Sequence, residues 1–440
     1  MDETADLSLL AQEVLLTNDH GKYTIPAEGL YPHQWLWDSC FIAIGMRHYD
    51  VERAQTELIS LLRGQWSNGM LPHMIFAAGE EHYRDKDIWR SWLNPHAPSK
   101  VATSGMTQPP MLAEAVCAIG EKLNRLERRT LFHKFYTALL AHHQWLYNER
   151  DPHNEGLTLQ VHSWETGMDN TPPWMSQLHD HKMPLWVRLA DNKFFSFVGN
   201  LIRRDHSFAT PGERLTAFEA AALYSVQHRL RRKAYDIDKI LSHSLFAIED
   251  LTFNSILIRA NHHLRYIAKT IGKQLPEELR ESMRKTESSL ELLWDTETGQ
   301  YYSRDFVTHN LIKVPSIATL MPLYSGKVSK ERAAELVKLL KDKKQFGLQY
   351  PVPSTPQNTE WFRPHGYWRG PVWINTNWLI IDGLKQYGFK EEAAELTKST
   401  IELIEKSGFY EYFSPLDGTP AGVNNFSWSA ALTIDLLIYK

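Results

Sequence analysis

The sequence predicts an all-α protein folded as an (α/α)6 toroid, with long functional loops gathered on one face. Three observations lead to this fold: helical periodicity recurs through most of the 440 residues, sustained β alternation is absent, and turns rich in Asp and Gly separate the helices. About a dozen helices with polar motifs at alternate junctions describe a ring of inner and outer helices. An open solenoid is the alternative, but no fixed sequence period supports one.

Each expected helix carries an apolar stripe at three- and four-residue spacings. The clearest lies in 251–271, where Ile256, Ala260, Leu264 and Ile267 share one face. Comparable stripes predict helices over 51–63, 110–123, 130–147, 214–230, 275–294, 330–342, 373–387, 390–406 and 428–438. Helix ends are marked by Gly64, Gly272 and Gly408. Extended segments fit only 157–164 and 300–306.

No Ser/Gly-rich or like-charged run divides the chain, so we expect one catalytic domain over 1–440, with loop insertions around 65–108 and 175–213. Lys and Arg total 48 against 52 Asp and Glu, a formal net charge of −4, which argues against a nucleic-acid partner. No run approaches the roughly 20 apolar residues of a membrane helix, so no membrane association is expected.

Two features of the sequence predict a cytoplasmic location. The start, MDETADLSLL, is acidic and lacks the basic-then-apolar pattern of a signal peptide. The two cysteines, Cys40 and Cys117, both lie beside helix-like apolar sequence. Two such thiols suit burial in a reducing compartment better than a disulfide framework.

The 15 tryptophans are unevenly placed. Trp145 and Trp294 lie in helix stripes and are expected in the core. Others stand among Asp, Glu, Asn and Gln, where an indole more often forms a pocket wall that stacks on the C–H face of a sugar. The tryptophans in or beside such motifs are Trp35, Trp37, Trp164, Trp174, Trp361, Trp368, Trp373, Trp378 and Trp428.

Two motifs carry candidate catalytic carboxyl groups. In 162–174, HSWETGMDNTPPW, the Gly, Asn and Pro-Pro predict a shaped loop around Glu165 and Asp169. Asp169 alone could be a turn or N-cap residue, but the flanking tryptophans favour a pocket. In 408–418, GFYEYFSPLDG, Glu411 stands among four aromatic residues. Such a Glu is either salt-bridged or functional, because burying an unpaired carboxylate is costly.

Three further motifs are rich in aromatic and amide side chains. The segment 361–378, WFRPHGYWRGPVWINTNW, contains Tyr367 and also Arg369, which we interpret as a structural donor that fixes nearby loops. In 31–39, YPHQWLWDS, Asp38 could N-cap the helix that follows, bind sugar hydroxyls, or do both. In 103–110, TSGMTQPP, Gln108 precedes a Pro-Pro helix start.

Two distant carboxylates in such loops fit glycoside hydrolysis. One protonated carboxyl donates to the glycosidic oxygen, while the other either attacks the anomeric carbon or activates water. The residues alone leave retaining and inverting mechanisms open. The sequence has no Walker A loop, GxGxxG after a strand, GxSxG or HExxH. Among the histidines, His179 and His181 make only a weak metal candidate, so neither a metal nor a cofactor is expected.

The ordered set of motifs closely resembles glycoside hydrolase family 63, most of all its compact branch of mannosylglycerate and glucosylglycerate hydrolases. The motifs run from Tyr31 to Trp428: LYPHQWLWDSCF, TSGMTQPP, WETGMDNTPPW, YWRGPVWINTNW, YEYFSPLDG and FSWSAAL. The resemblance implies an (α/α)6 barrel that hydrolyses 2-O-α-mannosyl- or glucosyl-D-glycerate to hexose and glycerate. It also implies inversion, with Asp169 as general acid and Glu411 as general base.

The resemblance further implies a set of substrate-binding positions. Those matching the sugar-binding motifs are Tyr31, Trp35, Trp37, Asp38, Gly167, Tyr367, Trp368, Trp373 and Trp428. Those matching glycerate-binding positions are Tyr83, Gln108 and Arg214. The chain departs from the family pattern in a longer 174–214 segment, with Phe194, Phe195 and Phe197, where Arg203 and Arg204 compete with Arg214. The Tyr83 loop also continues as RDKDIWRSW instead of a short Gly-Pro turn.

Three other functions fit parts of the sequence. The first is an α-glucosidase acting on a neutral disaccharide or oligosaccharide. The second is a sugar epimerase on the same toroid, which would place histidines where this chain has carboxylates. The third is an inactive sugar-binding protein, disfavoured because both carboxylates are present. The sequence does not distinguish mannose from glucose as the sugar of the substrate. It is compatible with a monomer and with a homo-oligomer.

Overall fold

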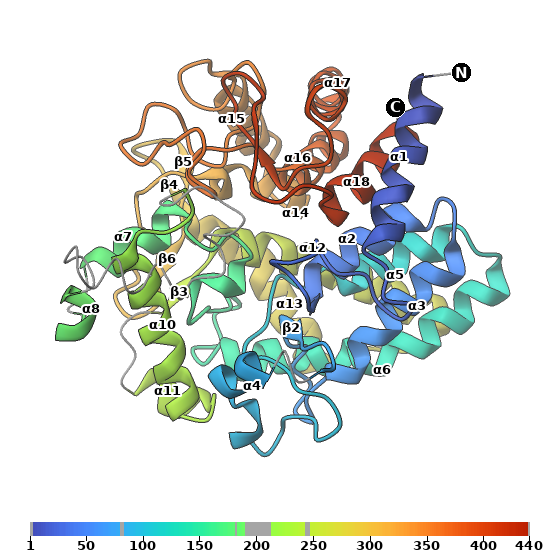
Figure 1. Cartoon of the computed structure of the whole chain (residues 1–440). Coiled ribbons are helices and arrows are strands. Elements are labelled where there is room, and N and C mark those ends of the chain that lie inside the picture. Colours follow the sequence, from blue (N-terminus) through green and yellow to red (C-terminus); the bar gives the residue numbers. More distant parts are fainter. Residues whose placement is uncertain (1–2, 80–82, 181–182, 190–212, 243–246, 439–440) are drawn as a thin grey trace.

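Helices make up most of the computed structural model, which describes residues 3–79, 83–180, 183–189, 213–242 and 247–438 (Figure 1). The all-α prediction is confirmed. Short 3-10 helices lie at helix ends or in loops: η1 (Leu62–Gly64), η3 (Ser91–Leu93), η4 (Ser163–Thr166), η6 (Leu290–Leu293) and η7 (Ile317–Leu320). No helix among the described residues combines the length and apolarity needed to cross a membrane.

An inner ring of helices forms the barrel. Its members are α2 (Leu36–Met46), α5 (Leu112–Glu121), α12 (Leu251–Ile271), α14 (Pro322–Ser325), α16 (Ile374–Tyr387) and α18 (Ser427–Ile438). Each contacts the next in this order, and α18 contacts α2, so the ring closes. This closure confirms the toroid and rules out the open solenoid.

An outer layer of helices packs around the ring. Its members are α1 (Glu3–Thr17), α3 (Val51–Leu61), α6 (Arg125–Arg150), α13 (Glu277–Ser289), α15 (Lys330–Lys341) and α17 (Lys390–Ser407). Here α1 packs on α18, α3 on α2, α6 between α5 and α12, and α17 on α16. The core lies between the two layers, where aromatic side chains such as Phe132 and Phe135 are fully buried.

Helix boundaries follow local capping chemistry. Asn124 and Glu127 form a capping box at the start of α6, and the Asp250 carboxylate accepts the Phe253 N–H at the start of α12. Gly272, in a left-handed conformation, ends α12 as the sequence predicts. The stripe over 251–271 therefore corresponds to one continuous helix.

Smaller helices form a group beside the barrel: α4 (Tyr83–Trp89), α7 (Pro172–Asp180), α8 (Leu185–Leu189), α10 (Ala217–Arg232) and α11 (Ile237–Leu241). Within it, α10 contacts α4, α7 and α8 (Figure 1). The expected insertion over 65–108 contains α4, and the described part of 175–213 contains the end of α7 and all of α8. The single-domain organisation remains a prediction.

Four pairs of two-residue strands connect loops. The antiparallel pairs are β1 (Gln34–Trp35) with β2 (Met74–Ile75), β3 (Ile248–Glu249) with β6 (Arg304–Asp305), β4 (Trp294–Asp295) with β5 (Gln300–Tyr301), and β7 (Tyr412–Phe413) with β8 (Pro420–Ala421). The expectation that only 157–164 and 300–306 are extended was wrong, because a two-residue strand is too short to show alternation.

Six of the described α-helices were not expected from the sequence. The stripe of α1 was not recognised, and α4, α7 and α8 lie in segments interpreted as loops. The helices α11 and α14 span only five and four residues, too few to show a stripe. The motif that starts at His162 does form a loop, but a helix begins within it at Pro172. Proline is tolerated in the first turn of a helix because the N–H it lacks would be unpaired there.

Candidate active site

The predicted site residues meet at one end of the barrel, where the inner helices begin. Trp37 lies in the first turn of α2, Trp373 is the N-cap residue of α16, and Trp428 lies in the first turn of α18. A cavity of about 390 Å³ opens at this end. Its lining includes five of the predicted residues, namely Tyr31, Trp35, Asp169, Arg214 and Tyr367.

Part of the cavity wall was not predicted. His33, His73 and Asp85 line it, and the His33 Nε2 lies 3.1 Å from an Asp85 carboxylate oxygen. Further lining residues are Ile88 and Trp89 of α4 and Leu223, Tyr224 and Gln227 of α10. These residues belong to helices of ordinary composition, so no motif could single them out.

Glu411 is buried just before β7 and accepts hydrogen bonds on both oxygens. The Tyr31 hydroxyl donates to Oε1 at 2.7 Å. The Arg214 guanidinium and the Val423 N–H, the latter at 3.1 Å, donate to Oε2. Burial raises the pKa of Glu411, and the Arg214 charge opposes that rise. Of the two alternatives that the sequence left for this residue, the salt bridge is present, and it does not exclude a catalytic role.

Asp169 faces the same cavity with a different partner. The Tyr367 hydroxyl donates to its Oδ2 at 3.3 Å. Loss of water around the carboxyl raises the pKa of Asp169 to about 6, although Arg214 and Tyr367 favour the charged form. Two carboxyl groups in such different surroundings can divide the acid and base roles.

Arg214 pairs with Glu411, and its charge also acts on Asp169. Its Nη1 donates to the Tyr31 hydroxyl at 2.5 Å, and its guanidinium carbon lies 4.6 Å from the Tyr367 ring centroid. The side chain is buried, at 7% exposure. The resemblance implied that this arginine holds the glycerate, whereas in this structure it is bound to Glu411.

The other two expected glycerate-binding residues are placed as follows. Gln108 is buried, and its Oε1 lies 3.4 Å from the Trp37 backbone N–H, which donates to it at the start of α2. The backbone of Tyr83 begins α4, but its side chain lies outside the described residues. Phe194, Phe195, Phe197, Arg203, Arg204 and His181 also lie outside them.

Asp38 is buried near both catalytic candidates. The proposed N-cap role was wrong, because α2 already begins at Leu36 and Trp35 occupies the N-cap position. Burial raises the pKa of Asp38 well above its usual range, and the negative charges of Glu411 and Asp169 add to the rise. These effects favour the protonated form of Asp38, which can donate a hydrogen bond.

A layer of tryptophans packs next to the carboxyl groups. The Trp368 and Trp373 rings stack with centroids 3.8 Å apart, and Trp37 meets Trp428 edge-on at 5.4 Å. A Cβ on Gly167 would lie 2.3 Å from the Trp37 ring, so only glycine fits there. Within the described part of the chain, no acceptor reaches the buried indole N–H of Trp35, Trp368 or Trp428.

The expectation that motif tryptophans form a pocket wall was wrong for Trp174. This residue is fully buried, and its indole donates to Asp250 at 3.0 Å. Trp378 lines a different cavity from Asp169, and its indole donates to Asp435 at 2.8 Å. A buried indole needs a polar acceptor, so tryptophans among polar residues can also be structural.

Asn170 ties three functional loops together. Its side-chain amide donates to the backbone oxygens of Arg214, at 2.5 Å, and Gly366, at 3.2 Å. Its Oδ1 accepts the Trp368 N–H at 2.8 Å. The residue that follows Asp169 thereby sets the positions of the arginine and of the Tyr367–Trp368 loop.

Two charged residues of the motifs prove structural. Arg369 pairs with Glu219 at 2.7 Å, which confirms the prediction that it fixes nearby loops. Glu165 pairs with Arg150 at 2.7 Å and accepts the Val161 N–H at 2.8 Å. Of the two acids in that motif, only Asp169 faces the cavity.

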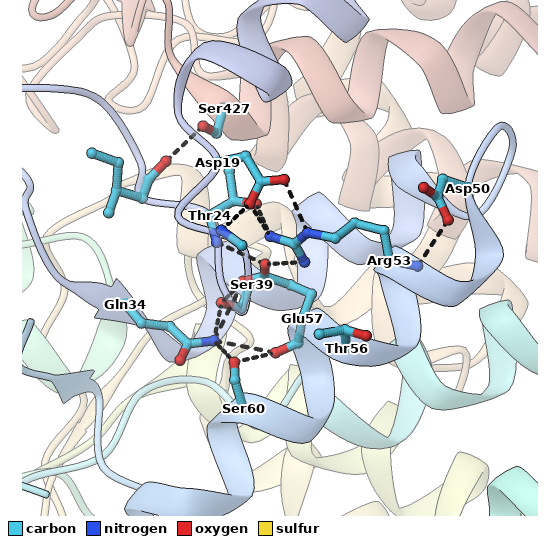
Figure 2. Close-up of polar contacts among 12 residues, drawn as sticks. Asp19, Thr24, Gln34, Ser39, Asp50, Arg53, Thr56, Glu57, Ser60 and Ser427 are labelled. Carbon is cyan, nitrogen blue, oxygen red and sulfur yellow. Dashed lines mark hydrogen bonds and ion pairs between the residues drawn. The ribbon is translucent and has the colours of Figure 1, made fainter.

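A buried polar network around Glu57 anchors the segment that carries Tyr31, Trp35 and Asp38 (Figure 2). Glu57 is fully buried and accepts from the Ser39 hydroxyl, the Gln34 amide at 3.3 Å and Arg53 at 3.0 Å. These bonds hold both ends of the Gln34–Ser39 stretch.

The same network reaches the far end of the chain. Arg53 also pairs with Asp19 at 2.8 Å. Beside that turn, the Ser427 hydroxyl donates to the Ile25 oxygen at 2.7 Å and accepts from Asn18 at 2.9 Å (Figure 2). Ser427 is the first residue of α18, so the loop leading from Glu411 is tied to the N-terminal segment.

The remaining cysteine and histidine candidates are explained by packing. Cys40 and Cys117 are free and buried, as expected. His143 hydrogen-bonds to Asn261 at 2.9 Å. His179 lies 3.3 Å from Glu219. The expected absence of a metal and of a cofactor stays a prediction.

A barrel of this kind, with one carboxyl group in the wall of an aromatic cavity and a second buried against two residues of that wall, defines a glycoside hydrolase. The chain belongs to the family described as the mannosylglycerate hydrolase MGH1-like glycoside hydrolase domain, whose model matches residues 31–429. The predicted membership of family 63 is thus confirmed, as is the class of enzyme.

Relatives and solved structures agree with this assignment. The chain is 39% identical to a mannosylglycerate hydrolase from Thermus thermophilus over 96% of this chain and 99% of that protein. It is 31% identical to a glucosylglycerate hydrolase from Mycolicibacterium hassiacum, covering 98% and 97%. A crystal structure of a family 63 mannosylglycerate hydrolase from Thermus thermophilus with Tris and D-glycerate has a TM-score of 0.87 at 38% identity, covering 99% of this chain and 100% of that one.

Proposed function

We propose that this enzyme hydrolyses 2-O-α-mannosyl- or 2-O-α-glucosyl-D-glycerate to the free hexose and glycerate, with inversion. The observation that carries the proposal is the pair of carboxyl groups, Asp169 and Glu411, with the Arg214 cation acting on both. Relatives of both substrate types, similar over nearly the whole chain, support it.

The two carboxyl groups take different roles. Asp169, with a pKa of about 6, donates its proton to the glycosidic oxygen as the C1–O bond breaks. Glu411 accepts a proton from a water molecule, whose oxygen forms the new bond to C1 from the opposite face. The Tyr31 hydroxyl and Arg214 hold the Glu411 carboxylate in place, and their hydrogen bonds favour its charged form.

The substrate positions follow from the same assignment. We place the hexose against Trp35 and Tyr367, which line the cavity, and against Asp38, which lies close enough to both carboxyl groups for their charges to raise its pKa. The same subsite also includes Tyr31, Trp37, Gly167, Trp368, Trp373 and Trp428. We place the glycerate near Tyr83, Gln108 and Arg214, because a carboxylated leaving group needs a cation or several donors.

The direct test is hydrolysis of matched substrates. Purified enzyme is incubated with 2-O-α-mannosyl-D-glycerate, 2-O-α-glucosyl-D-glycerate and the two corresponding glycosyl glycerols, which lack only the carboxylate. We expect glycerate release from at least one acid substrate, with the β-hexose as the first product by NMR. Turnover of only the neutral substrates would instead identify a neutral α-glycosidase, and an α-hexose product would refute inversion.

We also propose a cytoplasmic location, because both cysteines are free and buried and the chain contains no disulfide among its described residues. Fractionation of the native host, with antibody detection, tests this. Recovery of the protein outside the cytoplasmic fraction would contradict it.

A further inference from the structure

A second cluster of ligating side chains lies away from the catalytic cavity, where the turn after α6 meets the turn after β6. His153 and Glu155 stand in the first turn and His309 in the second. One ligand atom from each lies within 4.8 Å of the other two. Two imidazoles and a carboxylate are a ligand set that Zn²⁺ binds in proteins. We propose that these three side chains form a zinc site that is independent of hydrolysis.

The two oxygens of Glu155 have separate partners. Oε2 accepts from Arg304 at 2.6 Å, whereas Oε1 faces His309 Nδ1 at 4.0 Å. Arg304 is itself buried and bound at 2.9 Å by Glu249, whose charge offsets that of the arginine. A partner of this kind orients a ligating carboxylate while leaving its other oxygen for the metal.

Both imidazoles are already held near this oxygen. The His153 ring stacks on Phe306, with centroids 4.4 Å apart and an interplanar angle of 15°. His309 adopts a left-handed backbone conformation, φ 57°, and its N–H donates to the Asp305 oxygen at 2.9 Å. The two imidazole centroids lie 5.6 Å apart.

Small side-chain rotations complete the coordination. In a tetrahedral site, ligands bonded to zinc at about 2.0–2.1 Å lie about 3.3–3.4 Å from one another. The cluster therefore has to contract by up to about 1.5 Å, which the exposed His153 and His309 side chains permit. Because both histidines are exposed, solvent supplies the fourth ligand of a tetrahedral site.

The bound ion would connect two loops of different origin. The turn at His153 leads into the loop that ends at Asp169, and the turn at His309 follows β6. A metal that binds the folded state and not the unfolded chain stabilises the fold by mass action. The ion therefore holds together the turn at His153, which precedes the loop of the proposed acid Asp169, and the turn at His309, and it does not contact the substrate.

The experiment uses enzyme without a histidine tag, treated with EDTA and dialysed. Isothermal titration calorimetry with Zn²⁺ is expected to give one ion per chain, and zinc is expected to raise the Tm. Two variants remove ligands and keep the local structure. His153→Phe retains the ring stack on Phe306, and His309→Asn retains a residue that tolerates the left-handed conformation.

Each ligand variant is expected to weaken zinc binding at least tenfold, while its Tm in EDTA stays that of the wild type. His133→Asn, at an exposed position of α6, is the matched control and should bind zinc as the wild type does. Absence of stoichiometric zinc binding by the wild type would overturn the proposal, as would unchanged binding by both ligand variants. Loss of hydrolysis on zinc removal would contradict the independence of the two sites.

Discussion

Arg214 donates a hydrogen bond to the Glu411 carboxylate and, through its other terminal nitrogen, to the Tyr31 hydroxyl that also binds that carboxylate. The proposed base and the only cation lining the described cavity thus form one buried ion pair. Because the same arginine favours the charged form of Asp169, it acts on the acid and the base together.

Removing either carboxyl function should abolish most activity while leaving the fold intact. We expect Asp169→Asn and Glu411→Gln each to lower kcat by about 10²–10⁴-fold, the usual contribution of general acid–base catalysis. Hexose release measures the loss, and the Tm of each variant checks the fold. Wild-type rates in either variant would refute the assignment of that residue.

The value of kcat/KM should decline as the pH rises above about 6. Asp169 has to be protonated to act as an acid, and its pKa is about 6, so the active fraction declines above that pH. In Arg214→Gln, the cation that favours both carboxylates is lost, so both limbs should move to higher pH. Initial rates at subsaturating substrate between pH 4 and 9 test this, and unshifted limbs in the variant would contradict it.

Gly422 should be essential for the position of Glu411. A Cβ at this residue would lie 2.5 Å from the Glu411 Oε2. Since a displacement of about 1 Å can cost about 10²-fold in rate, Gly422→Ala should lower kcat strongly. Gly299→Ala is the control, because Gly299 also has a positive φ but has nothing within 4 Å of its added Cβ. Similar kcat losses in both variants would show that backbone strain alone is responsible.

The Glu57 network should dominate local stability. Glu57→Ala leaves Arg53 and several donors without their acceptor, so we expect a loss of about 3–5 kcal/mol. Glu281→Ala, in an exposed pair with Arg284, should lower the Tm far less, because solvent screens an exposed ion pair. Thermal unfolding of both variants makes the comparison. Equal Tm values for Glu57→Ala and Glu281→Ala would show that the buried network contributes no more to stability than a surface ion pair.

Glu114 should make the protein less stable as the pH rises toward 8. Burial raises the pKa of this α5 carboxyl to about 8. The folded state therefore keeps a proton that the unfolded chain releases above about 4.5, and stability falls between these two values. Glu114→Gln should remove this dependence and raise the Tm most at pH 8, by the equivalent of about 1–3 kcal/mol. Glu121→Gln, on the exposed side of the same helix, is the control, and parallel Tm profiles for all three proteins would refute the prediction.

The fold was largely predictable because helix stripes are local. The range 251–271 was predicted residue for residue, since one apolar face and a terminal glycine specify the helix. In contrast, α7 starts at Pro172 inside a segment whose composition is typical of a loop. Two-residue strands such as β7 leave no periodic trace at all.

The candidate site was predictable as a set of residues but not as a set of contacts. The motifs identified Asp169, Glu411 and Arg214, yet their spacing in the chain says nothing about which groups pair. Arg214 is bound to Glu411 because the fold brings them together in a buried space, where a cation needs an anion. His153 and His309 were not expected to meet, because they lie in turns that are far apart in the sequence and only the fold brings them together.

The contacts of α18 with α1 and α2 have a consequence for synthesis on the ribosome. The barrel closes only when α18 packs against α1 and α2. Tyr31 and its partner Glu411 come from opposite ends of the chain. A nascent chain carries the proposed acid, Asp169, well before it carries the base, Glu411. A product that stops before Glu411 therefore cannot assemble a working pair, and hydrolysis requires synthesis through α18.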